Sequence, residues 1–313
     1  MNANRDVRTI RDAIRWATAT EVAAPKVGNV TPADRFDDLT ADDFLVAGRI
    51  VAQSLTRFEM PLGARIRNAV NRVRRRCGTN VNLGITLLLA PLAEAGYYGD
   101  LSQDVDARIA ASTDDDCHQI LLAIGESQAG GLSTQTMHDV HRVVADPSQD
   151  EDRTFGDPNP PSREAAKSIR DVMALAADRD EIAAWWSRGY DPLFDVVVPI
   201  LQRNRLAHAD WERAIANAHI ELLRRTPDTL IARKCGWSTA VEVQTLANQT
   251  DPNDSDSVKR LDAFLRSDGN RLNPGTTADK IAAGLFVIAL HQNIASGNDP
   301  VSNVSTHHPT RHA

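Results

Sequence analysis

The fold of this chain is decided by the stretch Cys77-Gly78-Thr79-Asn80-Val81-Asn82-Leu83-Gly84-Ile85-Thr86-Leu87-Leu88-Leu89-Ala90-Pro91-Leu92-Ala93-Glu94-Ala95-Gly96. Its first part is small and polar, and its second part is the most continuous apolar run of the sequence. A segment that is apolar on every side is typical of a helix buried in a protein core. The stretch therefore predicts a central buried helix at about residues 82–95, with a polar entry loop at its N-terminus.

A strongly basic segment leads into this stretch. Its members are Arg65, Arg67, Arg72, Arg74, Arg75 and Arg76. The N-terminus of a helix carries free backbone N–H groups and a positive partial charge, which together attract anions. We therefore expect the entry loop to form the floor of a site for a phosphate-bearing ligand. A core helix with an ordinary polar entry loop is the alternative that the same residues allow.

The composition is that of a globular protein rich in helix. Of 313 residues, 42% are hydrophobic, 25% charged and 5% aromatic, and alanine, leucine and arginine, which favour helices, are abundant. A formal net charge of −7 argues against a general nucleic-acid binder, which is normally basic. The three cysteines, Cys77, Cys117 and Cys235, have no paired spacing. They predict neither a disulfide framework nor a zinc site.

The chain has no expected membrane segment. Its N-terminus lacks the apolar core of a signal peptide, and its longest apolar run contains Gly84, Thr86 and Pro91 and is too short to span a bilayer. We expect a soluble cytoplasmic protein that binds neither membrane nor nucleic acid. Assembly into a homo-oligomer is left open.

Apolar residues at helical spacing recur along the chain, whereas alternating strand patterns and sequence repeats are not evident. Helices are expected at about 6–20, 41–55, 62–76, 114–124, 136–144, 163–177, 181–186, 191–206, 211–225, 227–234, 239–248, 257–266 and 278–293. Residues 196–198, three valines, could instead form a short strand. The predicted fold is all-α, with one large multi-helix domain over residues 1–297, a long irregular loop at 146–161 and a disordered tail at 298–313.

Three polar segments form an ordered set. They are residues 25–30 (Pro-Lys-Val-Gly-Asn-Val), residues 78–84 (Gly-Thr-Asn-Val-Asn-Leu-Gly) and residues 273–279 (Asn-Pro-Gly-Thr-Thr-Ala-Asp), the last followed by Phe286. They resemble, in this order, the PKPG-x-V, GVNTHKG and NPG-x-x-AD…F motifs of the triphosphoribosyl-dephospho-CoA synthase family. Asp38 lies where that family has the acid of its H-x-D-M segment.

The resemblance implies an all-helical transferase that acts on nucleotide small molecules. The family moves a triphosphoribosyl group from ATP to the ribose 2′-hydroxyl of dephospho-CoA and releases adenine. This chain departs from the family pattern in three places. Val81-Asn82-Leu83 replaces Thr-His-Lys, Phe36 replaces the histidine before the acid, and Val27 replaces the second proline of the first loop.

Transfer of a triphosphoribosyl group needs cations and backbone N–H groups that hold the triphosphate, and carboxylates that hold Mg²⁺. The expected phosphate- or substrate-binding residues are Lys26, Gly28, Arg65, Arg67, Asn80, Asn82, Asn273 and Gly275. Asp38 and Asp279 are the expected catalytic acids or bases and Mg²⁺ ligands. Each has a structural alternative, such as an exposed surface lysine at Lys26 or a Thr276-x-x-Asp279 capping box.

Two other functions stay open at this stage. The same scaffold could carry a different reaction in one-carbon metabolism with methanopterin-type cofactors, because the family's histidine and lysine are missing. A non-catalytic helical binding protein is the other alternative, and it predicts no polar cavity shared by Lys26, Asp38, Asn80, Asn82 and Asp279.

Overall fold

The computed structural model of the chain describes residues 5–37, 39–79, 81–127 and 168–292. Asp38, Asn80, the expected loop at 146–161 and the expected tail at 298–313 lie outside these ranges. The described residues form helices and no β-strand, apart from a single bridge between Phe36 and Leu39. The all-α fold class predicted from the sequence is confirmed.

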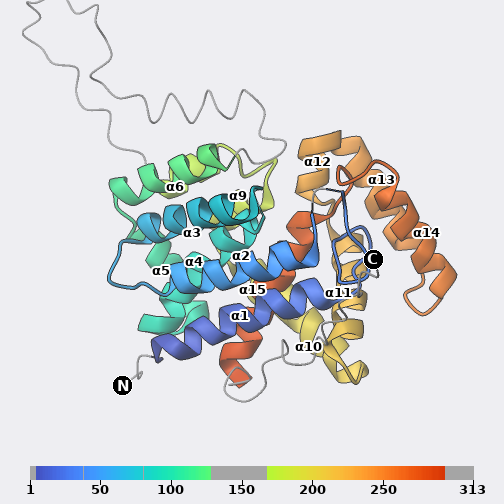
Figure 1. Cartoon of the computed structure of the whole chain (residues 1–313), viewed down its shortest axis with the longest axis horizontal. Helices are drawn as coiled ribbons and strands as arrows, with labels where there is room; N and C mark the ends of the chain where they lie inside the picture. The colour runs from blue at the N-terminus through green and yellow to red at the C-terminus, as the bar shows by residue number, and fades with distance from the viewer. Residues whose placement is uncertain (1–4, 38, 80, 128–167, 293–313) are drawn as a thin grey trace, which may run out of the picture.

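Figure 1 shows the helices of the described residues in their arrangement along the chain. Their bounds are α1 Val7–Ala23, α2 Ala41–Leu55, α3 Leu62–Cys77, α4 Leu83–Tyr98, α5 Leu101–Ala110, α6 Asp114–Glu126, α8 Ile169–Ala174, α9 Glu181–Arg188, the π-helical turn η2 Leu193–Val197, α10 Val198–Ala207, α11 Trp211–Arg225, α12 Thr229–Cys235, α13 Trp237–Gln249, α14 Ser255–Arg266 and α15 Gly275–Gln292.

Two apolar helices, α4 and α15, form the centre of the molecule. Helix α4 is the predicted central helix, begins at Leu83 and continues to Tyr98, and it is buried from Ile85 to Ala93. Helix α15 packs on α4 and on α1, α10 and α11. In Figure 1, α15 passes behind α1, α2 and α4. Because both helices are apolar on all sides, other helices must cover them to remove that surface from water.

The surrounding helices begin where the sequence places their caps. Thr40 and Asp43 form a capping box at the start of α2, and Thr113 and Asp116 form another at the start of α6. Each box satisfies two backbone donors that the first helical turn leaves free. The alternative of a short strand at 196–198 is not realised, since these residues lie in the π-helical turn and the first turn of α10, within the helix predicted at 191–206.

A second, smaller hydrophobic cluster lies among α11, α12, α13 and α14. Helix α11 joins it to the larger cluster, because Ile215 and Leu222 belong to the larger one and Ile220 and Leu223 to the smaller. Figure 1 shows α12, α13 and α14 along one side of the molecule, away from α5 and α6. No helix of the described residues combines the length and apolar character that crossing a membrane requires.

Pro91 interrupts the hydrogen bonding of α4, because proline has no N–H to donate to the carbonyl of Leu87. The indole Nε1 of Trp186 donates to that carbonyl at 3.2 Å, and the Tyr190 hydroxyl donates to the next one, of Leu88, at 3.3 Å. Trp186 and Tyr190 are fully buried. The proline of the central helix is therefore compensated by a tertiary contact.

Trp186→Phe should lower the free energy of unfolding by about 1–3 kcal/mol, because the buried Leu87 carbonyl loses its donor. In a Pro91→Ala background the loss should be smaller, since residue 91 then supplies a backbone N–H. Urea unfolding of the four proteins measures the coupling. Equal losses in both backgrounds would show that the indole does not compensate for the proline.

Candidate functional site

The N-terminal ends of α4, α9 and α15 meet at a cavity of about 540 Å³. It lies between the larger cluster of helices and the α11–α14 side. Four of the residues predicted from the sequence line this cavity, namely Asn82, Asn273, Gly275 and Asp279. They come from segments nearly two hundred residues apart in the sequence, and only the packing of α15 on α4 brings them together.

Asp279 is placed by the burial pattern of α15. Every residue of this helix from Thr276 to Leu290 is buried except Asp279, which faces the cavity. Its carboxylate lies directly against Gly84, so that a Cβ added to Gly84 would overlap Asp279 Oδ2. The glycine is required by this close approach of the carboxylate to the first turn of α4.

The environment of Asp279 disfavours its charged form. Burial raises the pKa of this carboxyl well above its ordinary value, and the nearby carboxylates of Glu21 and Asp228 raise it further. The Arg233 guanidinium and a hydrogen bond from the Ile85 backbone N–H lower the same pKa but do not offset the other effects. A cation that entered the cavity would stabilise the ionised form of Asp279.

Glu21, in the last turns of α1, is a cavity residue that the sequence reasoning missed. It is buried, and its Oε1 lies 3.0 Å from Lys26 Nζ. Glu21 follows Ile10, Ile14 and Ala17 on the buried face of α1, which is the position where an apolar residue is expected. This acidic residue on an otherwise apolar helix face was the sequence signal that could have identified Glu21 as a site residue.

Lys26 does not line the cavity. Its ammonium is fully enclosed, pairs with Glu21, and donates to the backbone carbonyls of Glu21 and Ala24 at the C-terminal end of α1. This lysine therefore compensates the charge of Glu21 and closes the helix end. The expectation of a lysine free to bind phosphate is not met, and neither is the alternative of an exposed lysine.

Gly28 also has a structural role. Its φ of 71° lies in the left-handed region, and its N–H donates to Asp262 Oδ1 of α14 at 2.7 Å. A Cβ at this position would lie 2.7 Å from the Leu265 Cβ. The loop after α1 is thus docked on α14, and the Gly28 N–H is not available to a phosphate.

Arg65 and Arg67 face away from the cavity. Arg65 is buried, donates to the Leu55 carbonyl at 2.9 Å and pairs with Glu94. Arg67 binds Glu126 and Gln119 on α6. Of the predicted basic segment it is Arg74, at the end of α3, that reaches the cavity wall.

Asn82 shapes the start of α4. It adopts the left-handed conformation, with φ of 62°, which asparagine tolerates better than most residues. Its side chain does not cap the helix, and its Nδ2 donates to the Phe44 carbonyl at 3.4 Å. The buried Oδ1 has no hydrogen-bond partner among the described residues, so it can accept a hydrogen bond from a ligand in the cavity.

Three further cations line the cavity, namely Arg179, Arg233 and Lys234. Arg233 pairs with Asp180, whose other contacts cap the first turn of α9 at Ile182 and Ala183. Lys234 donates to the Asn270 carbonyl at 3.0 Å. No motif in the sequence distinguishes these cations from surface residues, because a pattern does not show which helix ends share a cavity.

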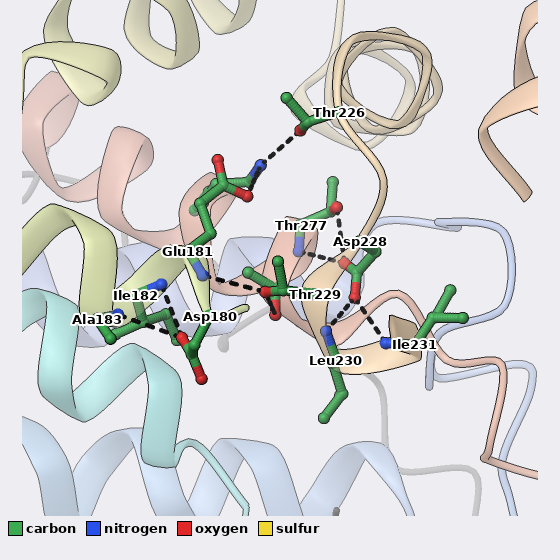
Figure 2. Close-up of polar contacts among 12 residues, drawn as sticks. Asp180, Glu181, Ile182, Ala183, Thr226, Asp228, Thr229, Leu230, Ile231 and Thr277 are labelled. Atoms are coloured by element: carbon green, nitrogen blue, oxygen red, sulfur yellow. Dashed lines mark hydrogen bonds and ion pairs between the residues drawn. The ribbon is translucent and has the colours of Figure 1, made fainter. Parts of the chain in front are cut away.

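The start of α15 is held by a partner from another helix. The helix begins at Gly275, so Thr276 lies inside it, and the N–H and hydroxyl of Thr277 both donate to Asp228 Oδ2 at 2.8 Å. Figure 2 shows this carboxylate between the first turns of α12 and α15. The expected Thr276-x-x-Asp279 capping box is therefore not formed, which leaves the Asp279 carboxylate to face the cavity.

His219 lies behind the cavity wall, fully buried on α11. Its Nε2 is 3.4 Å from Asn29 Nδ2. Burial lowers the pKa of this imidazole well below its ordinary value, and the ammonium groups of Lys26 and Lys280 lower it further. The imidazole is consequently neutral in the folded protein.

Comparisons with known proteins show what this chain is similar to. A model of the CitG family, described as ATP:dephospho-CoA triphosphoribosyl transferase, matches residues 7–298. A crystal structure from Archaeoglobus fulgidus, of a protein described as a candidate triphosphoribosyl-dephospho-CoA synthase, has a similar fold, with a TM-score of 0.58 and 20% sequence identity. The similarity covers 78% of this chain and 96% of that one. None of the curated proteins matches the sequence.

Gly84→Ala should displace the Asp279 carboxylate from the first turn of α4, because the new methyl group would occupy its position. The stabilisation of the protein by nucleotide and Mg²⁺, measured as a rise in Tm, should fall or disappear. Gly125→Ala is the matched control, since this helical glycine has open space around it. Equal nucleotide responses of both variants would contradict the placement of Asp279.

The neutral His219 predicts a specific pH dependence of stability. Its pKa is lowered on folding, so below about pH 6.5 the unfolded chain binds a proton that the folded protein does not, and stability falls by up to about 1.4 kcal/mol per pH unit. His219→Gln should flatten this fall between about pH 7 and about pH 5. The exposed His118→Gln should leave it unchanged, and chemical unfolding at several pH values measures both.

Proposed function

Because the chain belongs to the ATP:dephospho-CoA triphosphoribosyl transferase family, we propose that the cavity binds ATP and transfers its triphosphoribosyl group to a hydroxyl of dephospho-CoA or a related nucleotide. The bond between the ribose C1 and the adenine nitrogen breaks, and a bond between C1 and the acceptor oxygen forms. Adenine leaves with the proton that the acceptor hydroxyl loses, so that atoms and charge balance.

One observation carries this proposal. Asn82, from the second of the resembling motifs, and Asn273, Gly275 and Asp279, from the third, line a single cavity together with Glu21. Its volume of about 540 Å³ falls in the range of ligand pockets, about 300–1,000 Å³. If each of these residues had only a structural role, nothing would require all of them to line the same cavity.

The cations and helix ends of the cavity suit a triphosphate. Arg74, Arg179, Arg233 and Lys234 line it, and guanidinium groups bind phosphate oxygens with two N–H donors. The N-terminal turns of α4 and α15 add backbone N–H groups and a positive partial charge. These groups would hold the triphosphate and orient the ribose that carries it.

The carboxylates fit Mg²⁺, which is bound through one or two carboxylates and completes its shell with phosphate oxygens and waters. The described residues contain no group of three or more histidine, cysteine, aspartate or glutamate side chains that could hold a metal by itself. Glu21 and Asp279 line the same cavity, and the nearby Glu21 carboxylate raises the pKa of the Asp279 carboxyl. They would hold the ion, which would offset phosphate charge during the transfer.

In this proposal a carboxylate, and not a histidine or lysine, accepts the proton. At the positions where the family has Thr-His-Lys, this protein has Val81, Asn82 and Leu83, and all three line the cavity. None of these side chains ionises, so they cannot accept a proton. Asp279, whose pKa is raised mainly by burial, is suited to take the proton of the acceptor hydroxyl near neutral pH. Asp38 stays a prediction, since it lies outside the described residues.

The non-catalytic alternative predicted no shared polar cavity, yet Asn82 and Asp279 line one. No observation favours the alternative reaction in one-carbon metabolism, and a cytoplasmic location stays a prediction from the sequence.

The purified protein should release adenine when it is incubated with ATP, Mg²⁺ and dephospho-CoA. Asp279→Asn should lower the rate by about 10²–10⁴-fold, because the general base is lost. Asp256→Asn, at an exposed carboxylate on α14, is the matched control and should keep the wild-type rate. Adenine is measured by chromatography.

ATP that stays intact at high enzyme concentration would remove the proposed reaction. Wild-type activity of the Asp279→Asn variant would leave the reaction in place but assign the base to another group.

A further inference from the structure

Asp228 is a buried carboxylate that accepts four hydrogen bonds from two helices. Its Oδ1 accepts from the backbone N–H groups of Leu230 and Ile231 in α12, at 2.9 and 3.2 Å. Its Oδ2 accepts from the N–H and the hydroxyl of Thr277 in α15, both at 2.8 Å. Figure 2 shows all four contacts. The one side chain therefore caps α12 and ties it to the first turn of α15.

Both helices present cavity residues one turn beyond this tie. Arg233 lies on α12 and Asp279 on α15, and both line the cavity, whereas Asp228 does not. The Arg233 guanidinium is close enough to lower the pKa of the Asp279 carboxyl. The relative position of this cation and this carboxylate is thus set by the contact between the two helix ends.

Neighbouring side chains extend the tie to α9 (Figure 2). The Thr229 hydroxyl donates to Thr276 Oγ1 at 3.1 Å and accepts from the Glu181 backbone N–H at 3.3 Å. Lys280 Nζ donates to Glu181 Oε2 at 2.7 Å. Asp180, the partner of Arg233, directly precedes Glu181. The three helix ends around Arg233 therefore share one hydrogen-bonded network.

A carboxylate is the side chain that this geometry needs. All four donors point at its two oxygens, and each oxygen accepts two of them. An asparagine offers one oxygen and one NH₂ group, so either the α12 or the α15 donors would face another donor. Burial raises the pKa of Asp228, and the Thr277 donors and Lys280 lower it.

We propose that Asp228 is a positioning residue of the transferase site, which holds the N-terminal ends of α12 and α15 together and thereby sets Arg233 and Asp279 for the bound triphosphoribosyl donor. The inference rests on the proposed function. It goes beyond that function because Asp228 acts without touching the cavity.

The test compares Asp228→Asn with Asp254→Asn in the full chain. Asp254 is also an aspartate that caps a helix, α14, through a backbone N–H, but it contacts no helix end at the cavity. Thr277→Val is a milder second variant, because it removes the hydroxyl bond to Asp228 and keeps the backbone one. If the Asp228→Asn protein does not fold, Thr277→Val still tests the contact between the two helix ends.

Hydrogen exchange reports on the tie without any substrate. Asp228→Asn should speed exchange in both 229–235 and 275–280, and Thr277→Val should do so more weakly. Asp254→Asn should change neither segment. Unchanged exchange at 275–280 in both variants would overturn the proposal.

Adenine release reports on positioning. At a temperature well below the Tm of every variant, Asp228→Asn should lower kcat/KM by about tenfold to a hundredfold, as small displacements of positioned groups do. In an Arg233→Ala background the same change should have a smaller further effect, because one of the two groups that Asp228 positions is gone. The proposal would be overturned if the losses of kcat/KM from Asp228→Asn and Arg233→Ala multiplied in full in the double variant. It would also be overturned if Asp228→Asn lost no more kcat/KM than Asp254→Asn, because Asp228 would then only stabilise the helix as a cap.

The two proposals fail differently. A wild-type protein that releases no adenine removes the proposed function, and exchange still decides whether Asp228 ties the helix ends. An active wild type with an unaffected Asp228→Asn variant removes only the inference about Asp228.

Discussion

The packing of α15 on α4 is the contact on which the rest of the structure depends. Both helices are mainly apolar, and their N-terminal ends lie at the same cavity. The Asp279 carboxylate of α15 lies against the first turn of α4 at Gly84, where no side chain stands in the way. The hydrophobic effect drives the two helices together, and the glycine allows the carboxylate to reach the N-terminal turn of α4. The cavity follows from this meeting of helix ends.

Carboxylates govern the electrostatics of the site. Asp180 and Asp228 each cap the N-terminal end of a helix, and the Asp279 carboxylate lies against the first turn of α4. Lys26, Lys280 and Arg233 then pair with Glu21, Glu181 and Asp180. Burial, and then the nearby carboxylates of Glu21 and Asp228, raise the pKa of Asp279. A phosphate ligand would bring negative charge next to the arginines of the cavity. A cation bound to that phosphate would bring positive charge next to Asp279.

The departures from the family motifs change the chemistry without changing the fold. Val81, Asn82 and Leu83 keep their places in the cavity wall, but none of them carries or exchanges a proton. Arg179, Arg233 and Lys234, from the turn before α9 and from α12, bring positive charge to the same cavity. Cations at different points of the same cavity can hold a triphosphate, because the charge of a triphosphate is spread over many oxygens.

The sequence by itself determined the helical fold, the central helix and the caps at Thr40 and Thr113, because hydrophobic periodicity and capping chemistry are local. It also indicated Asn82, Asn273, Gly275 and Asp279 as site residues through their resemblance to family motifs. Only the tertiary structure decided that Lys26 pairs with Glu21, that Arg65 and Arg67 face elsewhere, and that Asp228 rather than Thr276 caps α15. Those roles depend on which residues from distant helices meet, and the charge of a side chain does not reveal its partner.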